Sequence, residues 1–120
     1  MKYVDGFVLP VPKKNLAAYR RMATECGKVW LECGALEFRE CVGDDLKIQK
    51  VKSFLSLVKP KGGETVMFSW IVFKSRAHRD RVNAKAMKDP RLNKMMKSQK
   101  KMPFDCKRMA YGGFKTIVDF

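Results

Sequence analysis

The longest apolar run of the chain predicts a buried strand followed by a helix. Residues 66–73 read VMFSWIVF, a length rich in β-branched and aromatic side chains that is typical of a strand buried on both faces. Ser75 follows at the position where its hydroxyl can accept from the free N–H groups of a helical first turn. One face of such a strand can pack against the chain's own helices. The other face needs a second layer, most simply another subunit.

The first third of the chain predicts a strand, a helix and a second strand. Residues 2–11 form the first strand, which Pro10 and Pro12 close. Asn15 is placed as the N-cap of a helix that stops at Gly34. Apolar side chains recur at steps of three and four through this helix: Leu16, Tyr19, Ala23, Cys26, Trp30 and Cys33. Residues 36–42 alternate with strand period.

The remaining residues repeat this plan after a long excursion, residues 44–63, with one or two helical turns in its middle. A strand at 65–74 leads to a helix from 76 to 88. Asp89 can cap and Pro90 can open a further helix that runs to 100. The last strand or strand pair lies within 107–120, where Gly112 and Gly113 indicate a bulge or bend.

Two β-α-β halves predict an α+β fold, a ferredoxin-like βαββαβ sandwich with helices on one face of a single sheet. The 120 residues fit one domain, 1–120. In the first strand we expect small residues under the helices, Val4, Gly6 and Val8, and the larger Tyr3, Asp5, Phe7 and Leu9 on the opposite face. Soluble monomers avoid such an apolar patch, so a homodimer formed sheet to sheet would cover it.

The cysteine content argues against a metal centre. Cys26, Cys33, Cys41 and Cys106 form no CxxC pair, and the chain has one histidine. We expect no metal, no cofactor, and buried, reduced thiols, with Cys26 and Cys33 facing the core. The N-terminal residues lack the pattern of a signal peptide, and no apolar stretch approaches about 20 residues. The expected location is the cytoplasm, with no membrane partner.

The chain is strongly basic, and its charge is unevenly distributed along the sequence. Lys and Arg number 26 against 12 Asp and Glu, a net charge of +14. Residues 74–108 hold thirteen Lys or Arg and three Asp. Such a surface attracts RNA, DNA or anionic small molecules, although it also suits a solvated helix face. Residues 74–103 carry no Phe, Tyr or Trp on which single-stranded bases could stack. Sequence-specific binding of nucleic acid is therefore not expected.

Two residues are candidates for chemistry, Asp5 and His78. Asp5 is a carboxylate in an apolar strand, and its burial is costly unless Arg39 or another cation meets it. The alternative role for Asp5 is an ion pair that closes the dimer or the sheet. His78 lies in the first turn of the second helix, where the helix N-terminus disfavours its protonated form. The alternative for His78 is a solvated basic face.

Further side chains are candidate ligand contacts around these two residues: Tyr3, Arg39, Trp70 and Arg79. Trp70 and Tyr111 could line an aromatic pocket, but core packing is the preferred explanation for both. Asp80 is expected to order the second helix through a local pair with Arg76, four residues earlier.

Three segments together resemble one family. They are YVDGFVLPVP at the start, SWIVFKSRAHRDRVNAKAMKDPR in the middle, and MPFDCKRMAYGGF near the end. The chain resembles the YbaA-like family of small bacterial proteins, whose function is unassigned, within the dimeric α+β barrel superfamily. That superfamily includes cofactor-independent monooxygenases, heme-degrading enzymes, lactone isomerases and proteins without known catalysis. The resemblance implies the dimeric barrel fold and leaves the activity open.

Two function classes follow from the sequence. The first is a small-molecule binder, or a cofactor-independent enzyme of the dimeric-barrel kind, with Asp5 or His78 as the polar group of its pocket. The second is an RNA- or anion-binding accessory protein that uses the basic surface of residues 76–101. The first is preferred, because an aromatic-rich sheet face requires an explanation and a basic surface does not.

Overall fold

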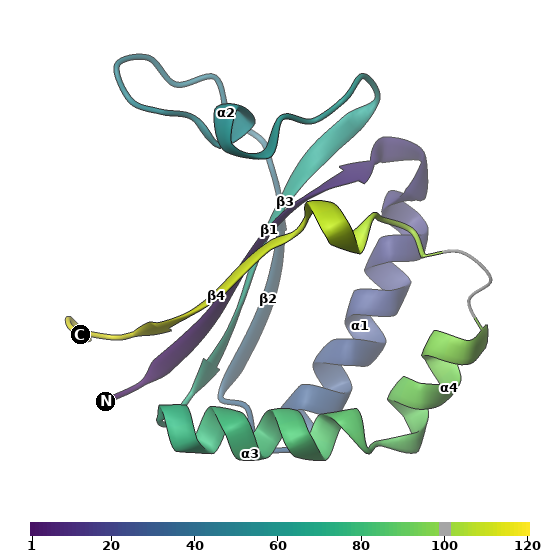
Figure 1. The fold of residues 1–120 in the computed structure, drawn as a ribbon, viewed down its shortest axis with the longest axis vertical. Helices are drawn as coiled ribbons and strands as arrows, with labels where there is room; N and C mark the ends of the chain where they lie inside the picture. Colours follow the sequence, from purple (N-terminus) through teal and green to yellow (C-terminus); the bar gives the residue numbers. More distant parts are fainter. Residues whose placement is uncertain (99–101) are drawn as a thin grey trace.

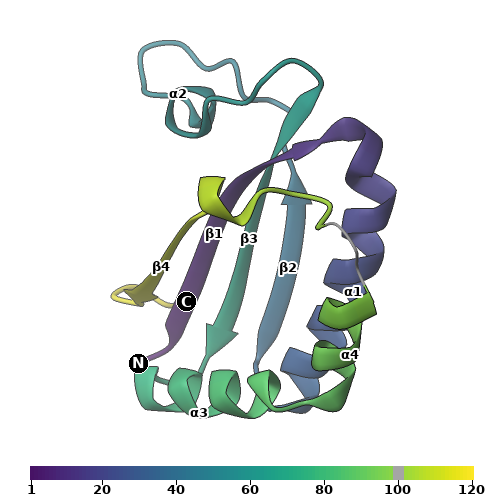
Figure 2. The same ribbon diagram turned by 45° about the vertical axis from the view of Figure 1, so that its right-hand side comes forward.

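The computed structural model describes residues 1–98 and 102–120 and shows a mixed α+β fold around one antiparallel sheet (Figure 1). The sheet order is β2-β3-β1-β4, and each neighbouring pair is antiparallel. The strands are β1 (Tyr3–Pro12), β2 (Glu37–Val42), β3 (Glu64–Phe73) and β4 (Ala110–Lys115). The longer helices are α1 (Leu16–Glu32), α3 (Arg76–Met87) and α4 (Pro90–Ser98). They lie to one side of the sheet, with α3 across its end (Figure 2).

Local signals set most of the element boundaries. Ser75 Oγ accepts from the backbone N–H of His78 at 3.1 Å and begins α3 as predicted. Gly34 has φ 121° directly after α1, a conformation that favours glycine. Asp89 Oδ1 accepts from the Arg91 backbone N–H at 2.9 Å beside Pro90. Asn15 holds the predicted N-cap position of α1, but its side chain makes no capping hydrogen bond. Asn15 belongs to a 3-10 turn (Lys13–Asn15), and its Nδ2 donates to the Pro103 carbonyl at 3.1 Å instead.

The expected facing of β1 was also wrong. Tyr3, Asp5 and Leu9 are buried under the helices, whereas Val4 and Gly6 face the open side. The larger side chains bury more apolar area against the helices, which favours this orientation. On the open side the Phe114 ring of β4 lies beside Gly6 and Gly112.

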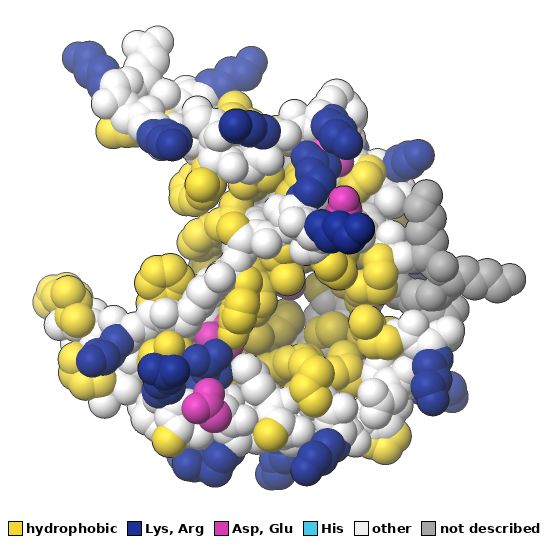
Figure 3. All heavy atoms as spheres, in the orientation of Figure 1, with side chains coloured by type: hydrophobic (Ala, Val, Ile, Leu, Met, Phe, Trp, Pro, Cys, Tyr) yellow, Lys and Arg dark blue, Asp and Glu magenta, His cyan; other side chains and the backbone are white. Residues whose placement is uncertain are grey.

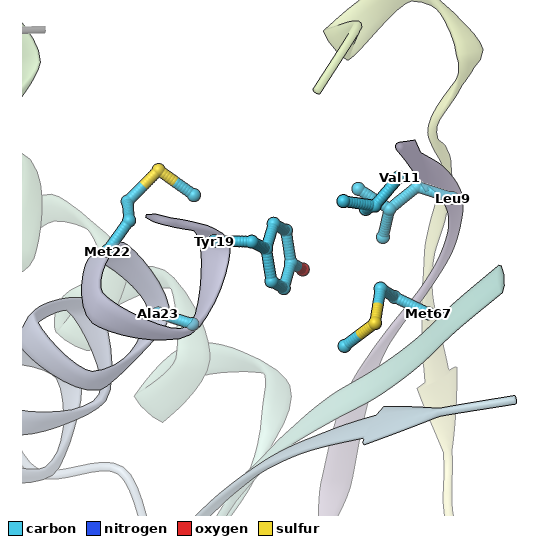
Figure 4. Close-up of a cluster of buried hydrophobic side chains, with 6 residues drawn as sticks. All are labelled: Leu9, Val11, Tyr19, Met22, Ala23 and Met67. Carbon is cyan, nitrogen blue, oxygen red and sulfur yellow. The ribbon is translucent and has the colours of Figure 1, made fainter. Parts of the chain in front are cut away.

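Two clusters of buried side chains join the helices to the sheet. The first connects α1 with β1 and β3, and Figure 4 shows Tyr19 reaching from its helix toward the strands. Its members are Leu9, Val11, Tyr19, Met22, Ala23 and Met67. The second lies nearer α3 and consists of Tyr3, Ala35, Ile71, Phe73 and Val82. The core therefore lies between the helices and one face of the sheet.

Among residues 1–98 and 102–120, the helices α1, α3 and α4 leave the opposite face of the sheet uncovered (Figure 1 and Figure 2). Phe68 of β3 is 42% exposed and Phe114 of β4 is 63% exposed. The excursion between β2 and β3 carries the short helix α2 (Phe54–Val58), as expected, and Phe54 meets Phe68 edge to face at 5.7 Å. Within one chain β3 is thus buried on one face. Its burial on both faces stays a prediction.

The C-terminal strand is shorter than expected, β4 at Ala110–Lys115, and it pairs with β1 without a bulge. The predicted bulge at Gly112 and Gly113 was therefore wrong. Glycine is required at 113 for space, since a Cβ atom there would overlap the ring of Tyr3.

The four cysteines are free, but only two behave as predicted. Cys26 and Cys33 are half-buried on α1 and beside it, whereas Cys41 and Cys106 are exposed. Burial raises the pKa of the Cys26 thiol to about 11. Over residues 1–98 and 102–120, no helix is long and apolar enough to cross a membrane.

Candidate functional site

A buried carboxylate lies where β1, β4 and α3 meet, and we call this cluster the Asp5 centre: Tyr3, Asp5, Arg79, Asn83 and Tyr111. The Asp5 side chain is 1% exposed on the helix face of β1, between Ile71 of β3 and Gly113 of β4 in the register of the sheet. Arg79 comes from the first turns of α3, which crosses this end of the sheet (Figure 2). The fold thus brings residues 5, 79 and 111 together.

Arg79 is the hub of the Asp5 centre. Its Nη1 lies 3.4 Å from Asp5 Oδ1 and donates to the Tyr111 hydroxyl at 2.9 Å. Its Nη2 donates to the Tyr3 hydroxyl at 3.4 Å, and its guanidinium carbon lies 5.0 Å from the centre of the Tyr3 ring. Tyr111 stacks on Phe7 with ring centres 4.8 Å apart. The planar guanidinium is therefore fixed between two tyrosines and a carboxylate.

Asn83 and Trp30 complete the surroundings of Asp5, and the sequence analysis missed both. Trp30 Nε1 donates to Asn83 Oδ1 at 2.9 Å, which leaves the amide NH₂ group of Asn83 to donate to Asp5. A sequence signal for Asn83 was present. Asn83 follows Arg79 by four residues, and that spacing places both side chains on one face of a helix.

Two opposing effects act on the pKa of the Asp5 carboxyl group. Burial raises the pKa of Asp5, while Arg79, Asn83 and Tyr111 act in the opposite direction, and the net result is a raised pKa. Two buried polar atoms of the described residues, Asp5 Oδ1 and Arg79 Nε, lack a hydrogen bond, although Arg79 Nε lies 3.0 Å from Asp80 Oδ1 as an ion pair. Such atoms are rare in native proteins and require an explanation.

Two of the predicted contacts lie on the other face of the sheet. Trp70 Nε1 donates to Glu37 Oε1 at 3.0 Å, and Arg39 Nε lies 3.9 Å from the same oxygen. The expected pairing of Arg39 with Asp5 was therefore wrong, because β3 separates their strands and Arg39 points to the open side. Trp70 and Tyr111 are likewise separated by the sheet and do not share a pocket.

His78 is next to Arg79 in sequence but has different neighbours. Its Nδ1 accepts from the backbone N–H of Lys74 at 3.0 Å, and its ring meets Phe73 edge to face at 6.2 Å. Burial lowers the pKa of His78, and the charges of Lys74 and Arg81 lower it further. The imidazole is thus neutral near pH 7, as predicted, but the contacts of His78 are separate from those of Asp5. Asp80 pairs with Arg79 where a pair with Arg76 was expected.

The space-filling view shows a hollow on the face of the molecule that carries α3 and β4 (Figure 3). Figure 3 shows a depression bordered by α3 and by the segment that leads into β4, with hydrophobic side chains inside and lysines and arginines around the rim. Tyr111 is 50% exposed on β4, whereas Asp5 lies behind it. A ligand oxygen could accept from Tyr111 or Arg79, and Asp5 could exchange a proton through the Tyr111 hydroxyl. Groups of three or more potential metal ligands were not found among residues 1–98 and 102–120.

Comparison with known proteins gives the family. Residues 2–106 match the model of a family described as a protein of unknown function, DUF1428. The uncharacterized protein YbaA of Escherichia coli K12 is 47% identical over 99% of both chains, and so is YbaA of Shigella flexneri. The structure of Rv0793 from Mycobacterium tuberculosis superposes with a TM-score of 0.59 at 11% identity, covering 99% of this chain and 98% of that chain, which shows a shared fold. The chain belongs to the DUF1428 family, with YbaA as a full-length relative.

Proposed function

We propose that this protein binds a small molecule at the Asp5 centre. The observation that supports the proposal most strongly is a carboxyl group, 1% exposed, whose pKa burial raises despite an arginine 3.4 Å away. An ion pair in which the attraction of Arg79 outweighed burial would instead lower the pKa of Asp5. Perturbed carboxyl groups beside a concave surface are typical of functional sites.

The proposed ligand carries an oxygen acceptor, such as a carbonyl or phenolate group, on an apolar or aromatic body. Its oxygen would accept from Tyr111 and from the Arg79 guanidinium, which already donates to that hydroxyl at 2.9 Å. Asp5 would hold the hydroxyl of Tyr111 in place and take up or return a proton through it. These residues need no cofactor for proton transfer, so an enzyme of the dimeric α+β barrel type falls within the proposal.

A binding screen with matched variants tests this site. Phenols and aryl ketones are screened by protein-observed NMR against the wild type, Asp5→Asn and Asp44→Asn, where Asp44 is an exposed control. Binding that shifts the signals of Tyr111 and Tyr3 and is lost only in Asp5→Asn supports the proposal. If no compound shifts these signals, or if Asp5→Asn binds as the wild type does, the Asp5 centre is not a ligand site.

We also propose that residues 1–120 form one ferredoxin-like domain and that two copies join through their open sheet faces as a dimeric α+β barrel. The element order and the strand order β2-β3-β1-β4 support this topology. The open face has apolar side chains on a central and an edge strand, Phe68 of β3 and Phe114 of β4, and side chains of both charges on β2, Glu37 and Arg39. A two-fold axis can bring such a face against itself, with opposite charges meeting. Four free cysteines fit the proposed cytoplasmic location.

The dimer is tested by light scattering and by one charge introduced on each side of the molecule. The wild type should have about twice the 13.8 kDa mass of the chain. Phe114→Asp, on the open face, should yield a monomer. Met87→Asp on α3, where the native side chain is 58% exposed, should leave the dimer intact. A wild-type monomer at micromolar concentration contradicts this part of the proposal.

The alternative, an RNA- or anion-binding accessory protein, has one supporting feature. Lys88, Lys94 and Lys97 line an open groove of about 640 Å³ along α4 and the turn that precedes it. Two other cations of this surface have internal partners, since Arg79 serves the Asp5 centre and Arg91 pairs with Asp89 and Glu32. Residues 99–101 of the predicted surface lie outside the described residues. Retention on heparin well above physiological salt would favour this alternative.

A further inference from the structure

A second carboxylate on the helix face occupies a different kind of site. Glu40 of β2 projects into a groove of about 730 Å³ between α1 and this edge strand. We call this the Glu40 groove. Its walls are mainly apolar, with Leu31 and Ala23 on the side of α1 and Phe38, Val42 and Met67 on the side of the sheet. This volume lies within the usual range for pockets that bind small molecules.

The sequence keeps the groove in shape through Gly27. A Cβ atom at this position of α1 would lie 3.0 Å from the ring of Phe38. Glycine inside a helix costs about 0.5–1 kcal/mol relative to alanine. The close approach of the Phe38 ring to α1 therefore depends on an unfavourable helix residue, and the ring forms part of the groove wall.

Hydroxyl groups rather than a cation hold the Glu40 carboxylate. The Tyr19 hydroxyl donates to Glu40 Oε1 at 2.8 Å, and the side chain of Ser69 also donates to this carboxylate. Figure 4 shows the Tyr19 ring directed away from its helix, into the space before the strands. In the part of the chain that the structure describes, Glu40 forms no ion pair. Burial raises the pKa of Glu40 against the effect of both donors.

The absence of a basic partner at Glu40 is unusual for this protein. Other half-buried carboxylates of the described residues have an arginine, as in the pairs of Glu64 with Arg108 and of Glu37 with Arg39. The chain has 26 basic residues for 12 acidic ones, so basic partners are abundant. Arg20 and Lys28 line the groove too, yet Lys28 pairs with Glu25 at 3.3 Å instead.

We infer that the Glu40 groove binds an apolar amine, whose ammonium group pairs with the Glu40 carboxylate while its hydrocarbon or aromatic body lies against Phe38 and Leu31. A carboxylate already fixed by Tyr19 and Ser69 retains lone pairs for a further donor. An ammonium group supplies both the missing charge and that hydrogen bond. The site is separate from the Asp5 centre, so it does not depend on the function proposed there.

Three probes that share one ring test the charge of the ligand: 2-phenylethylamine, 2-phenylethanol and 3-phenylpropionate. Binding is followed by NMR signals of Tyr19 and Phe38. We expect the amine to bind most tightly and Glu40→Gln to weaken it by about 10- to 100-fold, the value of one charge-assisted hydrogen bond. Glu37→Gln is the matched control, since Glu37 lies on the same strand but on the open face. It should bind the amine as the wild type does, and so should Asp5→Asn.

Each contrary result overturns the inference. Preference for 3-phenylpropionate would show that Arg20 and Lys28, rather than Glu40, select the ligand. Equal binding of the amine and the alcohol, or an unchanged affinity in Glu40→Gln, would show that the carboxylate is not used. Absence of any shift with millimolar amine would show that the groove does not bind amines, whatever happens at the Asp5 centre.

Discussion

The Asp5 centre and the Glu40 groove contain the same kind of group in two different settings. Both carboxyl groups lie on the helix face of the sheet, and burial raises the pKa of each. Asp5 is 1% exposed and has Arg79 at 3.4 Å, whereas Glu40 is half-buried with hydroxyl donors and no ion pair among the described residues. A deeply buried carboxylate needs a cationic partner, whereas hydrogen bonds are sufficient for a partly buried one.

The difference has a consequence for function. At the Asp5 centre the protein supplies the cation itself, so a ligand there meets Arg79 and Tyr111 before it meets the carboxylate. At the Glu40 groove no arginine is paired with the carboxylate among the described residues, so a ligand between the apolar walls can meet Glu40 directly, with Arg20 and Lys28 also in the lining. We therefore propose two recognition chemistries on one face of the sheet. At the Asp5 centre the protein would donate hydrogen bonds to an acceptor of the ligand, and at the Glu40 groove the carboxylate would accept from a donor of the ligand.

The largest effect should follow from removing the cation at the Asp5 centre. Arg79→Met leaves a buried carboxylate without its charged partner and should lower the free energy of unfolding by about 3–5 kcal/mol near pH 7. Lys28→Met at the Glu40 groove removes an exposed ion pair and should change it by about 0.5 kcal/mol or less. Urea denaturation of both variants measures the contrast. Equal losses would show that Arg79 does not stabilise the Asp5 carboxylate.

A pH series should reveal both carboxyl groups. Because the folded state raises the pKa of Asp5 above 3.8 and of Glu40 above 4.5, each group binds its proton more tightly when folded. The stability that each contributes is therefore present at low pH and is lost as the pH rises through the folded pKa. Asp5→Asn and Glu40→Gln should each gain stability relative to the wild type as the pH rises, by about 1.4 kcal/mol for each unit of pKa shift removed. A difference that does not change with pH would mean that neither pKa is raised.

Removing the tyrosine hydroxyl at each site should lower the stability of the protein, and here the larger loss is expected at the Glu40 groove. Tyr19→Phe removes a 2.8 Å hydrogen bond from a half-buried carboxylate and should cost about 1–2 kcal/mol. Tyr111→Phe should cost less, under about 1 kcal/mol, since water can reach a residue that is 50% exposed. Thermal unfolding of the two variants compares them. A larger loss for Tyr111→Phe would place its hydroxyl among the structural groups of the fold.

The smallest effect is expected at His78, which belongs to neither site. His78→Gln removes a hydrogen bond from the backbone N–H of Lys74 at an exposed position and should change the free energy of unfolding by about 0.5 kcal/mol or less. Binding of phenols and amines should be unchanged in the same screens. If the His78→Gln variant no longer bound these compounds, His78 would have to be counted among the residues of the binding site.

The sequence predicted those features that depend on neighbouring residues. Ser75, Gly34 and Asp89 determine helix ends through their own side chains or backbone, so those boundaries were confirmed. The face that β1 turns inward was not predictable in this way, because both faces of the strand carry apolar residues. The choice depends on Tyr19 and Val82, which come from distant parts of the chain.

The candidate site shows the same division. Asp5 stood out because a carboxylate interrupts an apolar strand, and a cationic partner was expected. Arg39, the one residue named for that role, lies on the other face of the sheet. Arg79 reaches Asp5 only because α3 crosses the end of the sheet (Figure 1). Glu40 looked like an ordinary alternating residue of a strand. Its position in a groove depends on Phe38, which packs against Gly27 of α1.

The most direct test of the central claim is a measurement of the pKa of the Asp5 carboxyl group. A carbon-13 NMR titration of the whole chain, in its native oligomeric state, gives this value. The claim is that Asp5 is held for binding and proton exchange and is not a simple structural ion pair. It predicts a pKa above the ordinary value of 3.8, because burial outweighs the effect of Arg79. A pKa at or below 3.8 would show that Arg79 fully stabilises the ionised carboxylate, and the Asp5 centre would then be a structural ion pair.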